Sequence, residues 1–221
     1  NNKIHIYGGY GFWSFKSFIT FFDENISQWD LIYNDSKYIP DGRWKPIYNI
    51  INDKFYVLGG RSGLAGSTNQ DESFSDVFYF DFIEKEFVNV GKLNPRFNPK
   101  YTLFSAPKIE DNIIILNNKH LTKIDFENLS FTDFHRGKSF SGVDNKYPSF
   151  IDDKNLYYIS DLNGEKLLNS IDIASIDTKF SSETFPLIIN ESKISFTQYI
   201  LFGFFIAFVF WVVLKIFSFK D

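Results

Sequence analysis

Four short strand-like segments recur along the first part of the chain, and this repetition constrains the fold more than any other feature. The segments are Lys3–Gly9, Lys54–Gly60, Asn112–Asn118 and Asn155–Asp161, and their starts are 51, 58 and 43 residues apart. The last three each follow an apolar residue and two turn-forming residues, in Ile51-Asn52-Asp53, Ile109-Glu110-Asp111 and Ile151-Asp152-Asp153. An apolar residue, a short turn and an alternating run together predict a hairpin that leads into a strand.

A second signature follows each segment. In the first three copies an apolar run ends at an Asp, and an aromatic residue follows six positions later. The pairs are Asp23/Trp29, Asp81/Phe87 and Asp125/Phe131. This pattern predicts a strand, a tight turn opened by Asp, and a return strand with a large ring on its buried face. The fourth copy, Ser170–Phe185, has Asp177 and Phe185 at a looser spacing.

Each repeat predicts a four-stranded antiparallel unit once a first strand, such as Trp44–Ile50 or Tyr101–Lys108, is added. Four such units with this period predict an all-β fold, a β-propeller of about four blades over residues 1–190. An ordinary β-sandwich is the alternative, since its strands are also short and alternating. Because both signatures recur in the same order, the propeller is the favoured interpretation.

At these residues the sequence resembles the kelch-repeat family, whose blades carry a Gly-Gly pair after the second strand, then a Tyr and a Trp. The matching residues are Gly8-Gly9 with Trp29, and Gly59-Gly60 with Tyr79 and with Phe87 in place of Trp. Asn117-Asn118 and Ser160-Asp161 replace the glycines in the last two repeats; Asn and Asp also tolerate a left-handed backbone. The resemblance covers about Lys3–Phe185.

Kelch propellers usually close with six or seven blades, so the resemblance implies that this chain is part of a larger ring. The first repeat lacks an initial strand, and the sequence contains no Met, which also suggests a fragment. An unpaired sheet edge exposes hydrogen-bonding groups, so we expect further blades upstream. A four-bladed ring completed by Leu187–Ser192 is the alternative.

The C-terminal part of the sequence predicts a membrane anchor. Tyr199–Leu214 contains no charged residue, and the apolar run resumes after Lys215 to Phe217. Nineteen residues at about 1.5 Å each span nearly the hydrocarbon core of about 30 Å. We therefore predict a juxtamembrane linker at 191–198, a transmembrane helix at 199–217 in the lipid bilayer, and a cytoplasmic stub at 218–221. A buried hydrophobic helix is the alternative. Because the N-terminal part resembles an exported β-domain, we place it outside the cytoplasm.

Catalytic chemistry is not indicated. The chain has no Cys, three His and a formal net charge of −4. The charge does not suggest nucleic-acid binding, and without Cys the Tyr–Cys crosslink of the copper-containing galactose oxidase family cannot form. No phosphate-binding loop, zinc-protease or serine-hydrolase motif is present. We therefore predict no enzyme activity, no cofactor and no metal; Asp152-Asp153 and the pair His120/His135 are more typical of turns and structural positions than of ligands.

Two loops that join second and third strands supply the candidate ligand contacts. The Tyr10–Ser17 loop offers Phe12, Trp13 and Phe15, and the Arg61–Ser75 loop offers Arg61, Asn69 and Asp71. Exposed rings and long polar loops commonly contact proteins or carbohydrates. The alternatives are that the rings pack on a neighbouring blade and that the long loop binds nothing.

These observations predict a single-pass membrane protein whose extracytoplasmic propeller binds a protein or carbohydrate ligand, as the sensor part of a larger receptor. A membrane-tethered adhesion or scaffold propeller without signalling is the main alternative. An ectoenzyme is the remaining one.

Overall fold

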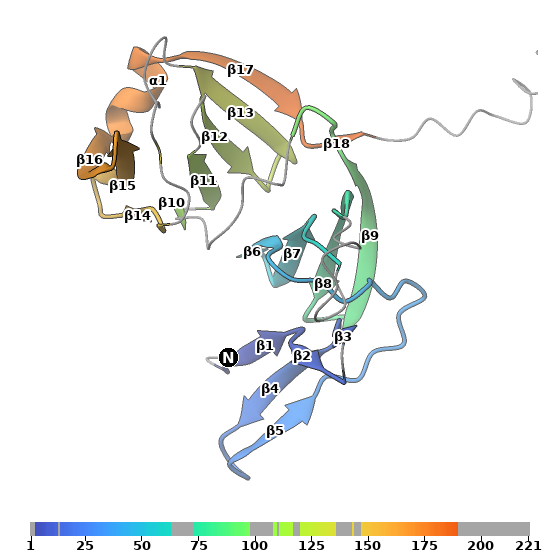
Figure 1. Ribbon diagram of the computed structural model, residues 1–221. Coiled ribbons are helices and arrows are strands. Elements are labelled where there is room, and N and C mark those ends of the chain that lie inside the picture. The colour runs from blue at the N-terminus through green and yellow to red at the C-terminus, as the bar shows by residue number, and fades with distance from the viewer. Residues whose placement is uncertain are drawn as a thin grey trace, which may run out of the picture. The chain divides into compact units, whose positions relative to one another are not determined.

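The computed structural model describes residues 3–12, 14–62, 73–97, 108–109, 111–116, 120–135, 143 and 147–189. The chain divides into two units, residues 1–189 and 190–221, and every described residue belongs to the first. The described residues of this unit are almost entirely β, with antiparallel sheets and two consecutive short helical turns (Figure 1). The predicted linker, transmembrane helix and stub lie outside the described residues. Within the described part of the chain, no helix has the length and apolar character needed to cross a membrane.

Four sheets follow one another along the chain, and we number them 1 to 4. Sheet 1 has the order β1-β4-β5, with β1 at His5–Tyr7, β4 at Ile19–Asp23 and β5 at Gln28–Leu31. A small hairpin of β2 (Tyr10–Gly11) and β3 (Ser14–Phe15) lies between β1 and β4 in the sequence. Sheet 2 has the order β18-β9-β8-β7-β6, with β6 at Ile47–Ile51, β7 at Lys54–Leu58, β8 at Asp76–Asp81, β9 at Glu86–Leu93 and β18 at Ile188–Ile189.

The second half of the unit contains sheets 3 and 4, which are also antiparallel. Sheet 3 has the order β10-β11-β12-β13-β17, with β10 at Lys108–Ile109, β11 at Asn112–Leu116, β12 at His120–Asp125, β13 at Ser130–His135 and β17 at Ser181–Pro186. Sheet 4 has the order β14-β15-β16, with β14 at Phe150–Ile151, β15 at Asn155–Leu162 and β16 at Glu165–Asp172. A 3₁₀ turn, η2 (Ile173–Ser175), and a single turn of helix, α1 (Ile176–Lys179), connect β16 to β17.

The three hairpins predicted from the Asp–aromatic pattern in the first three repeats are confirmed, and they share one geometry. The turns at 24–27, 82–85 and 126–129 each join two strands and each end in a residue with positive φ: Ser27, Lys85 and Leu129. In each turn a backbone N–H donates to the preceding Asp: Asn25 N to Asp23 Oδ1 (2.9 Å), Ile83 N to Asp81 Oδ1 (2.9 Å) and Asn128 N to Asp125 Oδ1 (2.9 Å). The Asp side chain therefore starts the turn by satisfying backbone donors that no strand partner can reach.

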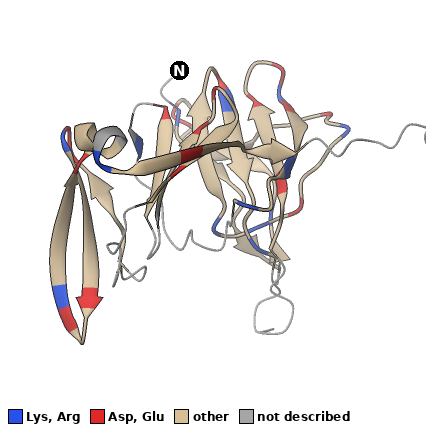
Figure 2. Cartoon of the chain, turned by 90° about the horizontal axis from the view of Figure 1, so that it is seen from above, with Lys and Arg blue, Asp and Glu red and all other residues tan. Residues whose placement is uncertain are grey.

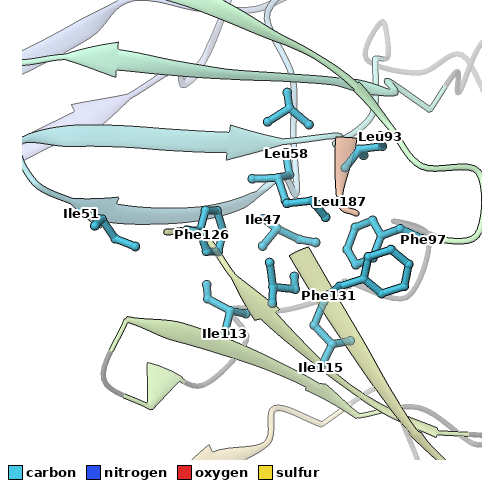
Figure 3. Close-up of a cluster of buried hydrophobic side chains, with 12 residues drawn as sticks. Ile47, Ile51, Leu58, Leu93, Phe97, Ile113, Ile115, Phe126, Phe131 and Leu187 are labelled. Atoms are coloured by element: carbon cyan, nitrogen blue, oxygen red, sulfur yellow. The ribbon is translucent and has the colours of Figure 1, made fainter. Parts of the chain in front are cut away.

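The four sheets pack on one another in chain order, and each interface has its own hydrophobic cluster. Alternation along β7 explains how sheet 2 serves two interfaces, since successive side chains point to opposite faces of a strand. Phe55 and Val57 belong to the cluster with sheet 1, whereas Leu58 and the partly buried Tyr56 belong to the cluster with sheet 3. In Figure 3 the cluster between sheets 2 and 3 includes Ile47, Ile51 and Leu58 from sheet 2 and Ile113, Ile115 and Phe131 from sheet 3.

The strands themselves carry few charges. Figure 2 shows charged residues mainly at turns and strand ends, and on the long β15–β16 hairpin they gather near the tip, where Asp161, Glu165 and Lys166 flank the turn. Strands β7 and β8 of sheet 2 and β11 of sheet 3 are instead nearly continuous apolar runs. Such runs are typical of strands that are buried on both faces.

The structure corrects the fourth repeat. Ser160-Asp161 does not end its strand, because β15 continues to Leu162 and turns at Asn163-Gly164, both with positive φ. The predicted Ser170–Phe185 hairpin is also wrong: Asp177 lies in α1, and Phe185 lies in β17, which leaves sheet 4 and pairs with β13 of sheet 3. Phe185 packs there on Phe131 at 5.4 Å between ring centroids, so the aromatic contact with sheet 3 provides a reason for this pairing.

The segment Ser181–Ile189, which we call the strap, covers the outer edges of two sheets. After β17 pairs with β13, β18 pairs with β9 of sheet 2, and the fully buried Leu187 fills the cluster between sheets 2 and 3. Gly91 makes room for this, because a Cβ there would lie 2.6 Å from the Cγ2 atom of Ile188. Ile188-Ile189 therefore does not complete sheet 1, as the four-bladed alternative required, and residues 190–192 lie outside the described part.

Trp29 departs from the expected buried position. Its equivalents Phe87 and Phe131 are buried against the preceding sheet, but half of the Trp29 surface is exposed (50%). Trp29 packs on Phe22 at 5.5 Å, on the face of sheet 1 that points away from sheet 2. Among the described residues no sheet covers that face, so the ring has solvent where Phe87 has a neighbouring sheet.

Candidate functional site

A cleft of about 540 Å³ lies between sheets 1 and 2. It is lined by β1, by the β2–β3 hairpin, by residues 43–46 before β6, and by residues of β6 and β7. Its walls are mainly aromatic and aliphatic, with Tyr7, Tyr10, Phe15, Trp44, Tyr48 and Ile50 among the lining side chains. This volume falls within the range of small-ligand pockets, about 300–1,000 Å³.

Glycines position the hairpin that forms one wall. Gly8 and Gly9 have φ values of 78° and 107°, which turn the chain out of β1 into the hairpin, as the Gly-Gly pattern predicts. Gly42 allows close approach from the other side, since a Cβ at this position would lie 2.0 Å from the carbonyl oxygen of Phe15. The hairpin can therefore rest directly on the segment that leads into β6.

Three rings form the mouth of the cleft. Phe15 stacks on Trp44 with centroids 6.2 Å apart and planes 6° from parallel, and Tyr10 meets Phe15 edge-on at 5.3 Å. The Nζ of Lys45 lies 4.5 Å from the Trp44 ring centre. Tyr10 is half-exposed, and both Phe15 and Trp44 retain some exposure. These rings offer both flat apolar faces and a nearby positive charge to a ligand.

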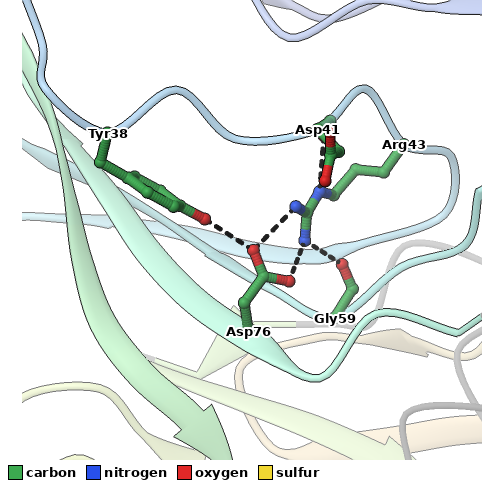
Figure 4. Close-up of polar contacts among 5 residues, drawn as sticks. All are labelled: Tyr38, Asp41, Arg43, Gly59 and Asp76. Carbon is green, nitrogen blue, oxygen red and sulfur yellow. Dashed lines mark hydrogen bonds and ion pairs between the residues drawn. The ribbon is translucent and has the colours of Figure 1, made fainter.

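A buried ion pair holds the Trp44 segment in place (Figure 4). Arg43 is fully buried and donates two hydrogen bonds to Asp76, Nη1 to Oδ1 at 2.7 Å and Nη2 to Oδ2 at 2.9 Å. Its remaining donors reach the carbonyl oxygens of Gly59 at 2.8 Å and Asp41 at 3.1 Å. Tyr38 Oη also donates to Asp76 Oδ2 at 2.7 Å. Because each of the three guanidinium nitrogens donates at least one hydrogen bond, the charge can stay buried.

Aromatic rings enclose this ion pair. The guanidinium carbon lies 4.3 Å from the ring centre of Phe74 and 4.8 Å from that of Phe78. The main chain on either side is also fixed: Trp44 N donates to Arg61 O, and Arg61 N donates to Trp44 O, both at 3.0 Å. The cleft wall at Trp44 is therefore tied to sheet 2 by main-chain hydrogen bonds and by the Arg43–Asp76 ion pair.

The ion pair shifts the pKa values of its neighbours. Burial alone would raise the pKa of Asp76, but the hydrogen bonds and positive charge of Arg43 outweigh burial and hold that pKa below its usual value. Burial and the hydrogen bond to Asp76 raise the pKa of Tyr38. Burial raises the pKa of Tyr7 to about 12. The Tyr7 hydroxyl is buried in the cleft wall near Arg43, whose charge acts to lower the pKa of Tyr7 but is outweighed by burial.

The two faces of β6 differ sharply in exposure. Tyr48 and Ile50 face the cleft with 51% and 53% of their surface exposed. On the opposite face, Ile47 and Asn49 are each 4% exposed and Ile51 is 8% exposed, because sheet 3 covers them. Asn49 also donates from Nδ2 to the carbonyl oxygen of Asp111 at 2.9 Å in that sheet.

The predicted contact residues separate into three groups. Phe15 lines the cleft, and Arg61 adjoins the cleft through its main-chain pairing with Trp44. Phe12 is 96% exposed but does not line the cleft; the Nζ of Lys16 lies 5.9 Å from its ring centre. Trp13, Asn69 and Asp71 lie outside the described residues.

Sequence reasoning missed the residues that shape the cleft most. The sequence pattern predicts only the start of a strand at Trp44, and it contains nothing that pairs Arg43 with Asp76. A lone Arg beside a Trp and a distant Asp at the start of a strand give no local signal, because 33 residues separate the partners. The scarcity of Arg in a chain rich in aromatic residues was the available hint.

Other candidate sites are weaker. A second cleft, of about 600 Å³, includes Lys3, Asp53 and Lys85 and contains none of the predicted contact residues. Asp152 Oδ1 accepts backbone hydrogen bonds from Lys154 and Asn155 at 2.8 and 2.7 Å, so this side chain serves its own turn. Within the described residues no group of three or more acidic or His side chains could hold a metal ion.

Comparison of the chain with protein-family models and with curated protein sequences finds no match.

Proposed function

We propose that this chain is a recognition module of the kelch-like propeller class, and that the cleft between sheets 1 and 2 binds its ligand. Three features support the propeller class: consecutive sheets packed face to face, three hairpin turns of one geometry, and glycines of positive φ after both β1 and β7. In propellers, each blade packs on its neighbours in chain order.

The observation that carries the binding proposal is the aromatic mouth of the cleft. Tyr10, Phe15 and Trp44 present partly exposed rings, and the Arg43–Asp76 ion pair anchors the wall that carries Trp44. Aromatic anchors in a preformed concave site are typical of both protein and carbohydrate recognition. The proposed ligand is accordingly a protein or a carbohydrate.

The proposed location rests on the sequence of residues 199–217. This run is long enough to span a bilayer. Because the N-terminal part resembles an exported β-domain, the proposed module lies on the extracytoplasmic side, as the sensor part of a larger receptor. Expression of the full chain followed by carbonate extraction tests this. We expect the chain to stay in the membrane pellet and to dissolve only in detergent; recovery in the carbonate supernatant would refute the anchor.

The ligand proposal is tested by screening the detergent-solubilised full chain against an oligosaccharide array and an immobilised peptide library. We expect binders whose affinity falls at least tenfold in the variants Trp44→Ala and Phe15→Ala. Phe12→Ala is the matched control, because Phe12 is an exposed ring of the same hairpin that does not line the cleft. Equal loss in all three variants, or binders that none of them affects, would count against the cleft.

A further inference from the structure

The turn between β4 and β5 contains the acceptor sequence for N-linked glycosylation. Asn25-Ile26-Ser27 has the form Asn-x-Ser, in which x is any residue except Pro. In such a sequence the sugar is added to the Asn side-chain amide, and the transferase recognises the Ser hydroxyl two positions later. The pattern alone is common, so the position of Asn25 in the fold decides whether this residue can carry a sugar.

Asn25 lies in the turn of the hairpin, on the surface. Residues 24–30 are all exposed, and Ile26 has 59% of its surface exposed. The main-chain N–H of Asn25 donates to Asp23 Oδ1 at 2.9 Å, but within the described residues the Asn25 side-chain amide has no hydrogen-bond partner. A sugar on this amide would therefore break no hydrogen bond of the turn.

Two equivalent turns show that sheet packing does not bury this position. Asn25 is the second residue of its turn, and Ile83 and Glu127 are the second residues of the equivalent turns in sheets 2 and 3. Both are exposed, Ile83 by 71%, although sheets 2 and 3 each have a neighbouring sheet on either face. We therefore expect Asn25 to stay exposed if another sheet packs on the far face of sheet 1.

Two other described asparagines begin the same pattern, but both triplets are tied to the fold. Asn128 donates from Nδ2 to Asp125 Oδ2 at 2.8 Å. Asn34 is only partly exposed, and Ser36, the third residue of its triplet, accepts a hydrogen bond at Oγ from the main chain of β9 at 2.7 Å. Among the described residues, Asn25 is therefore the acceptor whose modification disturbs the structure least.

We infer that Asn25 is an N-glycosylation site, and that its sugar donor is an oligosaccharide linked through a diphosphate to a lipid. In the transfer, the Nδ2 atom of Asn25 forms a bond to the anomeric carbon of the first sugar and loses a proton. The bond between that carbon and the diphosphate oxygen breaks, and the lipid diphosphate leaves with the electron pair. This inference rests on the proposed extracytoplasmic location, because such acceptor sequences are used in exported proteins.

The modification is separate from ligand binding at the cleft. Asn25 lines neither the cleft between sheets 1 and 2 nor the second cleft that includes Lys3 and Lys85. A glycan at Asn25 is therefore compatible with an open binding site, and Asn25→Gln should leave the affinity for any cleft ligand unchanged.

Expression of the full chain in eukaryotic cells, behind a cleavable signal sequence, tests the inference. The purified protein is treated with peptide N-glycosidase in heavy-oxygen water, and its peptides are analysed by mass spectrometry. The glycosidase converts a glycosylated Asn into Asp and introduces a heavy oxygen atom, so the modified residue is identified directly. We expect this label at Asn25. An unlabelled Asn25 would overturn the inference.

Variants confirm the assignment by electrophoresis. Asn25→Gln and Ser27→Ala should each remove one glycan and increase the mobility by one step. Asn163→Gln is the matched control, because Asn163 is also an exposed turn residue but Gly164-Glu165 follows it, so the pattern is absent. Asn25→Gln with the mobility of the unsubstituted chain would contradict the assignment.

A further variant separates the inference from the proposed location. Glu165→Thr completes the acceptor pattern at Asn163, in the exposed turn between β15 and β16. If Asn163 of this variant is labelled and Asn25 is not, the module reaches the glycosylating compartment and only the inference about Asn25 is wrong. If neither residue is labelled, the inference and the extracytoplasmic location both fail. Label at Asn25 supports the inference, while carbonate extraction decides the anchor independently.

Discussion

Arg43 and Asp76 form a buried, two-pronged ion pair that ties the segment before β6 to the first residue of β8. Removing one partner leaves the other charge buried and unpaired, which is unfavourable. We expect Arg43→Ala to lower the free energy of unfolding by about 3 kcal/mol, as is usual for a broken buried pair. Urea unfolding of the wild type and the variant measures this.

The double variant Arg43→Met with Asp76→Leu is the control for that loss. It removes both charges and keeps apolar volume, so it should recover much of the stability lost in Arg43→Ala. A double variant less stable than Arg43→Ala would contradict the view that the orphaned carboxylate causes the loss.

Asp76 should make the free energy of unfolding decrease at acidic pH. Its pKa lies below the usual value in the folded state, so the folded state binds fewer protons than the unfolded state as pH falls. The stabilisation is therefore present above about pH 4, the unfolded-state pKa, and is lost as pH falls through the lower folded-state pKa. Unfolding curves between pH 2 and pH 6, on the scale of ordinary carboxyl titrations, should fall more steeply for the wild type than for Asp76→Asn.

Tyr7 should make the free energy of unfolding decrease at alkaline pH. Burial raises its pKa to about 12, whereas an unfolded Tyr titrates near 10. The folded state retains this proton when the unfolded state has lost it, so stability declines as pH rises from about 10 to about 12. Tyr7→Phe should lessen that decline. A Tyr7 absorbance titration that ends near pH 10 would contradict the burial.

Trp29 and Phe87 occupy equivalent places in their sheets but should contribute differently to the free energy of unfolding. Phe87 is 4% exposed, so Phe87→Ala should cost about 3–5 kcal/mol through the lost contacts and the cavity. Trp29 is half-exposed, so Trp29→Ala should cost less than about 1 kcal/mol. Thermal and urea unfolding of both variants decides this. Similar costs would mean that another sheet covers Trp29 in solution.

Gly42 should be intolerant of even one methyl group. A Cβ there would meet the Phe15 carbonyl oxygen at 2.0 Å, so Gly42→Ala must displace the β2–β3 hairpin. We expect a loss of about 1–3 kcal/mol, typical of overpacking, together with weaker ligand binding at the cleft. Gly11→Ala is the matched control, because its Cβ would meet no atom within 4 Å. Equal effects of both substitutions would contradict the close approach.

Local features of the fold were predictable because their causes are local. Asp23, Asp81 and Asp125 each start a turn through hydrogen bonds to residues two or three positions away, so the signal is contained in the sequence itself. The glycines after β1 and β7 are equally local, since positive φ depends on the absence of a Cβ. The all-β class and the order of the repeats follow from these signals.

The cleft was only partly predictable. Phe15 was identified because an aromatic loop joins two predicted strands, but Phe12 of the same loop points away from the cleft. Trp44 and Arg43 become part of the site through contacts with Phe15 and Asp76, which are distant in the sequence. Whether a loop side chain points toward a neighbouring sheet depends on tertiary packing, and the spacing of apolar residues in the sequence does not reveal it.

The sequence by itself determined the strands, their turns and their repetition, since these depend on residues close together along the chain. Only the tertiary structure decided which edge each strand joins. β17 follows the fourth repeat in the sequence, yet it pairs with β13 of sheet 3, where Phe185 contacts Phe131. Leu187, which follows β17, is fully buried. The tertiary structure likewise decided that the Trp29 ring is half-exposed. Burial depends on the neighbours that folding brings together, and those neighbours are specified by the whole chain at once.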